Sequence, residues 1–277
     1  MKFKSSIKKW IIGMLLILTA AIIVSCIGVK SQINHHNGSK TELVDSSLFN
    51  VSQSPLAVAN VSVLSPECNE MRDSMTVLIK RGEIVSVGKN VKITKEYVII
   101  DGTGKYLIPG LIDTHTHLHR SKNDLLLYLA NGITSIANMN SLPDNTYLKW
   151  REEALNGALS PGIYIAAGGM STNTSFMAKI RTLFGSRYYN TPKKARKAVK
   201  EFKKKGYDAI KSYAPSKEVY HAIMDEAKKQ NIPVTGHLPF DVGLEELYNS
   251  GQSGLAHVEE ITKNTIIAFG GFSYAGS

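Results

Sequence analysis

The stretch IPGLIDTHTHLHR, residues 108–120, joins an apolar run to three histidines at every second position. Because side chains alternate along a strand, His115 and His117 point to the same side of it. Imidazole nitrogens suit zinc and related divalent ions. We therefore predict that His115 and His117 are metal ligands at the end of a buried strand. His119 lies beyond the expected strand end and is interpreted as a loop histidine, with a substrate contact as the alternative.

Short apolar runs and helical segments alternate from this stretch onward. Such alternation predicts βαβ units and a parallel sheet, which is an α/β fold. The expected strands are 110–117, 132–140, 162–169, 207–214, 232–239 and 253–260, and the expected helices are 121–131, 144–157, 191–205, 216–230 and 241–250. The pattern therefore predicts six successive βα units that begin at residue 110.

Polar residues recur where the later apolar runs end. Lys211 closes the fourth run, His237 the fifth and His257 the sixth. In a (β/α) barrel the carboxyl ends of the strands meet on one face, where active sites are built. A lone histidine at a strand end is more often a hydrogen-bonded core residue. Four histidines and a lysine at the same topological position instead predict a functional site.

The segments PGLIDTHTHLH, DAIKSYA, PVTGHLP and GLAHVEE, in this order and spacing, resemble the metal-dependent amidohydrolase superfamily. The branch is that of the imidazolonepropionases and Xaa-Pro dipeptidases, and the resemblance begins at about residue 55. It implies a (β/α)8 TIM-type barrel over residues 109–277, with six units present, after a small β-sandwich segment over residues 46–108. It also implies two divalent ions, with zinc as the expected metal. The implied ligands are His115 and His117 for one ion, and His237 and His257 for the other.

Lys211 is implied to bridge the two ions as a carbamate formed with CO2. A lysine ammonium beside two dications is strongly repelled, whereas a carbamate is an anion with one oxygen for each metal. An ordinary strand-end lysine, or an electrophile near the substrate, is the alternative. Two ions about 3.5–4 Å apart hold a hydroxide between them and polarise a substrate carbonyl. Tyr213 shares the facing of Lys211 and is a catalytic candidate that donates to a substrate carboxylate or carbonyl oxygen.

These features predict a hydrolase of carbon–nitrogen bonds in an amide, a cyclic amide or a dipeptide, acting through a metal-bridging hydroxide. The alternatives are a catalytically inactive binding or structural lipoprotein, and a phosphoester or lactone hydrolase with the same site. The resemblance also implies an aspartate at the end of an eighth strand as general base, which the 20 residues after His257 do not supply. We therefore expect a truncated or frameshifted product, or strands supplied by another chain. A homo-oligomer remains open.

The N-terminus carries four lysines within residues 2–9, and then an apolar run that ends at Cys26. The tripeptide before Cys26 resembles the lipobox of bacterial lipoproteins. This implies a signal peptide over residues 1–25, a lipid anchor on Cys26, and a location in the cell envelope, at the outer membrane if the cell has one. An uncleaved anchor is the alternative, because residues 10–29 are about long enough to span a bilayer. Residues 26–45 are expected to form a flexible tether.

The formal net charge of +10 does not indicate a nucleic-acid partner. Four of the charges lie in the leader, and KKARKAVKEFKKK, residues 193–205, holds eight basic residues and one acidic residue. Thr191-Pro192 before this segment and Gly206 after it predict an amphipathic helix whose basic face is solvated. The alternative is that this basic face lies near anionic lipid headgroups. Cys26 and Cys68 are the two cysteines, so a lipidated Cys26 excludes an internal disulfide.

Overall fold

The computed structural model describes residues 2–49, 54–139, 145–172, 175–176, 178, 188–239 and 241–270. The chain divides into two compact units. One unit is Val44–Leu111, and the other combines Met1–Leu43 with Ile112–Ser277. Each unit is described by itself.

The smaller unit is a five-stranded sheet with the order β3-β2-β1-β4, in which β5 also pairs with β1. A two-residue turn of Arg81 and Gly82, both with positive φ, joins β2 to β3 as hairpin geometry requires. The strands are β1 (Leu56–Leu64), β2 (Met71–Lys80), β3 (Glu83–Gly88), β4 (Val98–Asp101) and β5 (Tyr106–Leu107). The described part of this unit is one sheet, so the second layer of a sandwich stays a prediction.

The larger unit contains a six-stranded sheet with the order β11-β10-β9-β8-β7-β6. Each strand lies beside its predecessor in the chain, and the registered pairs from β7 to β11 are parallel. The strands are β6 (Leu111–Thr116), β7 (Ile133–Asn138), β8 (Gly162–Ser171), β9 (Ala209–Ala214), β10 (Val234–Gly236) and β11 (Gly254–Leu255). This sheet is a curled parallel half-barrel, which confirms the α/β fold and the succession of six βα units.

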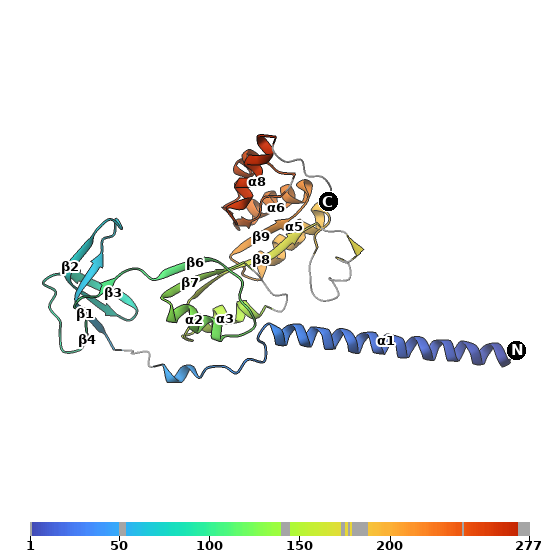
Figure 1. Ribbon diagram of the computed structural model, residues 1–277, viewed down its shortest axis with the longest axis horizontal. Coiled ribbons are helices and arrows are strands. Elements are labelled where there is room, and N and C mark those ends of the chain that lie inside the picture. Colours follow the sequence, from blue (N-terminus) through green and yellow to red (C-terminus); the bar gives the residue numbers. More distant parts are fainter. Residues whose placement is uncertain are drawn as a thin grey trace. The chain divides into compact units, whose positions relative to one another are not determined.

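Helices connect these strands, as the order of colours in Figure 1 shows. They begin and end within three residues of the predicted bounds. They are α2 (Asn123–Ala130), α3 (Thr146–Leu155), α5 (Pro192–Lys204), α6 (Lys217–Gln230) and α7 (Leu244–Ser250), and α8 (Glu259–Ala268) follows β11. The alternation of apolar runs is thus sufficient to locate most elements.

The basic helix α5 has the amphipathic character that its sequence predicts. Thr191 caps it by accepting from the backbone N–H of Lys194 at 3.3 Å, and Gly206 follows its end with φ of 82°. Its apolar residues Ala195, Ala198, Val199 and Phe202 are all buried. The apolar face of α5 therefore packs on the core, and its lysines lie on the side that faces solvent.

The N-terminal helix α1 runs from Lys2 to His36, so residues 27–36 are helical where a tether was predicted. No proline interrupts this stretch, and adding residues to an existing helix costs little. Gly38, whose φ is 86°, lies two residues after the end of the helix and turns the chain away from it. Gly38 N–H donates to the His35 carbonyl and Ser39 N–H to the Asn34 carbonyl, which is a Schellman motif.

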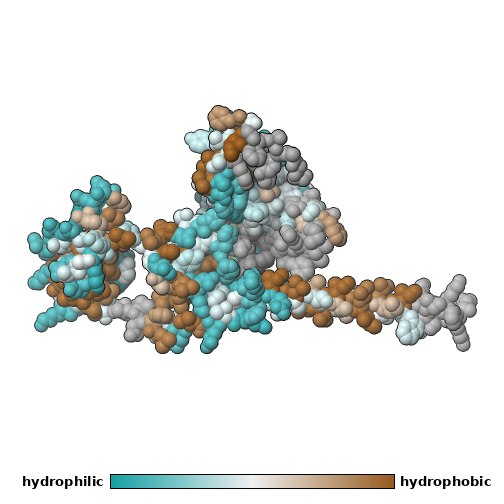
Figure 2. All heavy atoms as spheres, viewed as in Figure 1, coloured by the Kyte–Doolittle hydropathy of each residue, from teal (hydrophilic) through white to brown (hydrophobic). Residues whose placement is uncertain are grey.

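Within α1, Trp10–His36 is long and apolar enough to cross a membrane by length and composition. Figure 2 shows hydrophobic residues exposed along this helix. A signal sequence near the N-terminus meets the same criterion. Helix length therefore does not distinguish a cleaved leader from an anchor.

Candidate active site

The predicted site residues lie on four strands or directly after them. His115 is the fifth residue of β6, and His117 follows the end of that strand. His237 follows β10 directly, and His257 comes two residues after β11. Because the sheet curls, the carboxyl ends of β6 and β11, which lie at opposite ends of the strand order, come together with that of β10 and gather the four imidazoles.

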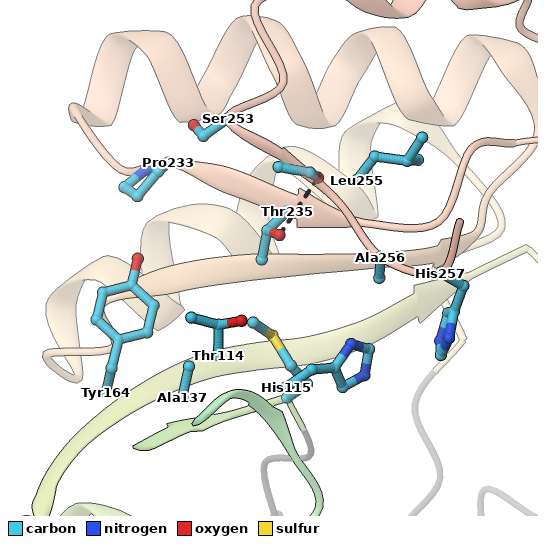
Figure 3. Close-up of a pocket in the computed structure, with 12 residues that line it drawn as sticks. Thr114, His115, Ala137, Tyr164, Pro233, Thr235, Ser253, Leu255, Ala256 and His257 are labelled. Atoms are coloured by element: carbon cyan, nitrogen blue, oxygen red, sulfur yellow. Dashed lines mark hydrogen bonds between the residues drawn. The ribbon is translucent and has the colours of Figure 1, made fainter. Parts of the chain in front are cut away.

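The four imidazoles form a continuous row. Ring centroids are 5.1 Å apart for His117 and His115, 4.7 Å for His115 and His257, and 4.8 Å for His257 and His237. Figure 3 shows His115 and His257 together at one end of the pocket. The structure thus brings together the four histidines that the sequence singles out.

The His115 and His117 pair has the spacing of two ligands of one ion. Their Nε2 atoms are 3.2 Å apart. Two nitrogens bound at about 2.05 Å to a tetrahedral ion lie about 3.3 Å apart. Among the described residues, however, no three histidine, cysteine, aspartate or glutamate side chains form a group that could hold a metal ion. The fit to a cation therefore rests on this pair and on Lys211.

Lys211 lies deeper than predicted, because it is the third of the six residues of β9 and does not close the strand. It pairs in register with Thr235 of β10 and Gly168 of β8. Only 2% of the residue is exposed, and its Nζ is buried with no hydrogen-bond partner among the described residues. Burial lowers the pKa of this amine from its ordinary value. An unpaired buried amine is costly, so it indicates a missing partner or a chemical role.

Burial and positive neighbours also favour neutral imidazoles. Burial, followed by the charge of Lys211, lowers the pKa of His115 from 6.5 to about 4. The same two causes lower the pKa of His117. The pKa of His237 is also lowered, chiefly by burial, although its hydrogen bond to Glu260 opposes the shift. Neutral imidazoles keep a lone pair available for a cation or a proton.

Two acidic residues that the sequence reasoning missed contact the histidine row from the first turn of α8. Glu260 Oε1 lies 3.0 Å from His237 Nδ1, and Glu259 Oε1 lies 3.6 Å from His257 Nδ1. The segment HVEE contains the signal, since acids follow a candidate ligand at a helix start. The contact of Glu260 with His237 could not be predicted from the sequence, because the two residues are 23 positions apart.

A third missed residue supports the chain that follows His117. Asn138, at the end of β7, is fully buried, and its side-chain oxygen accepts from the Leu118 backbone N–H at 3.1 Å. The Tyr147 hydroxyl donates to the Leu118 carbonyl. A neighbouring strand and helix α3 thus hold the segment in which His117 lies.

The two weaker candidates lie at different places. Tyr213 packs edge-to-face on His237 with ring centroids 4.8 Å apart and is 54% exposed, so it borders the row on the solvent side. The His119 side chain is 68% exposed and lies 3.8 Å from Asp124, outside the row.

A cavity of about 460 Å³ extends from His115 and His257 along the inner face of the sheet. Threonines from two strands and Tyr164 line it, and Figure 3 shows Tyr164 at the end away from the two histidines. The Tyr164 hydroxyl donates to the Asp208 carbonyl at 3.2 Å. The space suits a small molecule next to the imidazole row.

Comparisons with known proteins agree with this architecture. The Amidohydrolase family model matches residues 106–270. Imidazolonepropionase of Alkaliphilus metalliredigens is 45% identical over 65 residues, which are 21% of this chain and 15% of that protein. Dihydroorotase of Carboxydothermus hydrogenoformans is 30% identical over 112 residues, or 36% of this chain and 26% of that protein.

Solved structures share the fold. A Bifidobacterium longum protein described as a prolidase superposes with a TM-score of 0.59 at 26% identity, covering 72% of this chain and 52% of that one. The chain thus spans about half the length of that relative. Because the family model matches well over half of the 277 residues, the chain belongs to the amidohydrolase family.

Proposed function

We propose that this chain carries the metal-binding part of a hydrolase that cleaves carbon–nitrogen bonds. The observation that carries the proposal is the row of four imidazoles beside the buried Lys211 amine, for which the described part of the chain offers no hydrogen-bond partner. Membership of the amidohydrolase family and likeness to hydrolases support the reaction class. The substrate would be an amide, a cyclic amide or a dipeptide.

We propose that His115 and His117 hold one divalent cation and that His237 and His257 hold a second. The lowered pKa values of His115, His117 and His237 support these roles, because a ligating imidazole must be neutral. Bound zinc ions would lower the pKa of a water and polarise a substrate carbonyl. In this proposal the two pairs of imidazoles would hold these ions at the carboxyl edge of the sheet.

In this proposal Lys211 is carboxylated. A lowered pKa leaves part of its amine neutral, and a neutral amine has the lone pair that attacks CO2. The new N–C bond and the loss of one proton give a carbamate anion. The carbamate replaces the ammonium group that would repel metal ions. Its two oxygens could each bind one of the metal ions.

Tyr213 would act on the substrate. Its ring packs on His237, and it is exposed at the solvent side of the row. A phenol there can donate to a substrate carbonyl or carboxylate oxygen. Likeness to proteins described as prolidases and as a Xaa-Pro dipeptidase supports a substrate with such groups.

We also propose that the chain works at a membrane of the cell envelope, held by lipid on Cys26, with a small-molecule or dipeptide substrate as its main partner. The apolar helix before Cys26 supports a leader or anchor. A tethered enzyme of this kind needs no nucleic-acid partner. The basic face of α5 is explained by solvation.

Metal analysis and hydrolysis assays of the purified full chain test the function. We expect bound zinc or a similar ion, at least tenfold reduced by His115→Ala or His237→Ala, and unchanged by the matched variant His119→Ala. A panel of dipeptides, cyclic amides, lactones and phosphoesters then identifies the bond that is cleaved. Absence of metal from the unmodified chain after incubation with zinc would reject the site. Metal binding without any hydrolysis would instead favour a binding protein.

A further inference from the structure

The segment that follows α1 is docked on the chain that follows His117. The Arg120 backbone N–H donates to the Asn37 carbonyl at 2.7 Å, and the Asn123 side-chain amide donates to the Glu42 carbonyl at 2.9 Å. Both segments belong to the larger unit, although 81 positions separate Asn123 from Glu42. We call residues 37–42 the strap.

The strap packs closely against the larger unit at Gly38. A Cβ at this position would lie 3.1 Å from Ser121 Cβ, which is tighter than ordinary contact, and its φ of 86° favours glycine. Ser121 is buried, with 6% of the residue exposed. Gly38 therefore serves both the turn after α1 and the close approach of the strap to Ser121.

This contact lies at the carboxyl edge of the six-stranded sheet. Arg120 follows shortly after Thr116, which is the last residue of β6. The chain between them is held to the sheet through Leu118, whose backbone N–H donates to Asn138 Oδ1 at 3.1 Å. The strap is thus joined, through a few residues that are fixed at both ends, to the edge that carries the row of imidazoles.

The docked strap limits how far the site can lie from the point of membrane attachment. Residues 26–36 are helical, and a helix rises about 1.5 Å per residue, so Cys26 and His36 are about 15 Å apart. The chain from His117 to Arg120 spans about 10 Å at most. With the hydrogen bond between Asn37 and Arg120 added, His117 lies within roughly 35 Å of Cys26 for any direction of α1. A flexible tether over residues 26–45 would instead extend to about 70 Å.

We propose that the strap holds the carboxyl edge of the sheet toward the bilayer, so that the candidate site faces the lipid surface to which the chain is attached. This inference rests on the proposed membrane attachment. It applies both to a lipid on Cys26 and to α1 as an anchor, because Lys30 is the first charged residue after the apolar run and the strap follows it. The partner of this edge is the lipid headgroup layer.

A contact that only stabilises the fold would have different consequences. Its loss would lower the free energy of unfolding without moving any part of the folded sheet relative to the lipid. The distance of the carboxyl edge from the lipid surface is therefore the decisive measurement.

The test uses the full chain in lipid nanodiscs whose headgroups carry an energy acceptor. A fluorescent amino acid replaces either His119, which is exposed in the docked loop, or Lys228, which is exposed near the end of α6. Because α6 returns from the carboxyl end of β9 to the start of β10, Lys228 lies at the opposite edge of the sheet. Energy transfer falls steeply with distance, so we expect transfer from position 119 to be at least twofold higher than from position 228.

A matched pair of valine substitutions separates the strap from α1 itself. Gly38→Val combined with Asn123→Ala removes both points of docking, and transfer from position 119 should fall toward that from position 228. Gly28→Val is the control, because a Cβ at Gly28 would meet nothing within 4 Å, and it should keep the wild-type transfer. Circular dichroism and zinc content verify that each variant is folded.

Two outcomes would overturn the inference. One is equal transfer from positions 119 and 228 in the wild-type chain. The other is wild-type transfer from position 119 in the variant that carries Gly38→Val and Asn123→Ala. Failure of the wild-type chain to enter nanodiscs would reject the proposed attachment instead. Hydrogen exchange of the Arg120 amide would then still decide whether the strap is docked, with slow exchange expected in wild type and faster exchange in that variant.

Discussion

At the scale of single residues, the site is built from groups that are weak bases in this environment. Lys211 and the imidazoles of His115, His117 and His237 are positively charged when protonated, and burial lowers the pKa of each, with repulsion from Lys211 adding to the effect at the three histidines. Protonation of these groups therefore lowers the free energy of unfolding. A pH dependence of folding follows for the metal-free protein.

We expect the metal-free chain to lose stability as the pH falls from about 6.5 to about 4, with His115 as one cause. The folded-state pKa of about 4 lies below the ordinary 6.5, so in this window the unfolded chain binds more protons. Stability therefore rises with pH across the window and is constant, for this group, above it. NMR titration should give a midpoint for His115 near 4. His115→Gln should flatten the loss in urea unfolding curves, and an unchanged curve with a midpoint near 6.5 would contradict the expectation.

At the scale of elements, the sequence predicts the type and position of helices and strands, because the local pattern of apolar residues controls them. The hydrophobic periodicity locates helices α2, α3, α5, α6 and α7 and the strands, and the Thr191-Pro192 and Gly206 signals locate the ends of α5. The length of α1 is underestimated because polar residues after an apolar run were interpreted as irregular, although HNG contains the actual stop at Gly38. The local pattern thus predicts whether a segment is a helix or a strand better than it predicts the residue at which the segment ends.

The site is predicted less completely because contacts across strands depend on register. Histidines at strand ends could be grouped, since the carboxyl ends of the strands of a (β/α) barrel meet on one face. The depth of Lys211 within β9 and the reach of Glu260 to His237 depend on pairing and on how α8 returns to the sheet. The spacing of residues within one helix or strand does not show how that element pairs or packs with another.

The approach of β9 to β10 requires glycine at 236. This residue has φ of 130°, and a Cβ there would lie 2.0 Å from the Ser212 carbonyl oxygen. The next residue, His237, donates its backbone N–H to that same oxygen at 2.9 Å. A side chain at 236 would therefore move His237 and break the strand pair.

We expect Gly236→Ala to lower the free energy of unfolding by about 3 kcal/mol or more, from backbone strain and overpacking together. Gly162→Ala in β8 is the control, because its Cβ would meet Ser135 Oγ at 3.4 Å in ordinary contact. That control should stay within about 1 kcal/mol of wild type. Urea unfolding followed by circular dichroism measures both, and equal midpoints for the two variants would refute the steric argument.

At the scale of the whole molecule, the chemistry and the attachment lie in separate parts of the sequence. All residues of the candidate site lie between 112 and 270, whereas the apolar helix ends at His36. The sheet of residues 54–111 contributes none of the predicted ligands. Changes in attachment should therefore leave metal binding intact.

The two cysteines make the attachment testable. Cys26 lies within α1 behind the apolar run, and Cys68 lies exposed in the smaller unit. In a bacterial host given radiolabelled palmitate, we expect the wild-type chain and Cys68→Ser to incorporate label and to lose residues 1–25. Cys26→Ser should incorporate none and should keep its leader, while zinc content stays that of wild type. Label on Cys26→Ser would reject the lipid anchor. An unlabelled wild type with an intact N-terminus would favour α1 itself as the anchor, because a 27-residue helix with so apolar a stretch needs no lipid to cross a bilayer.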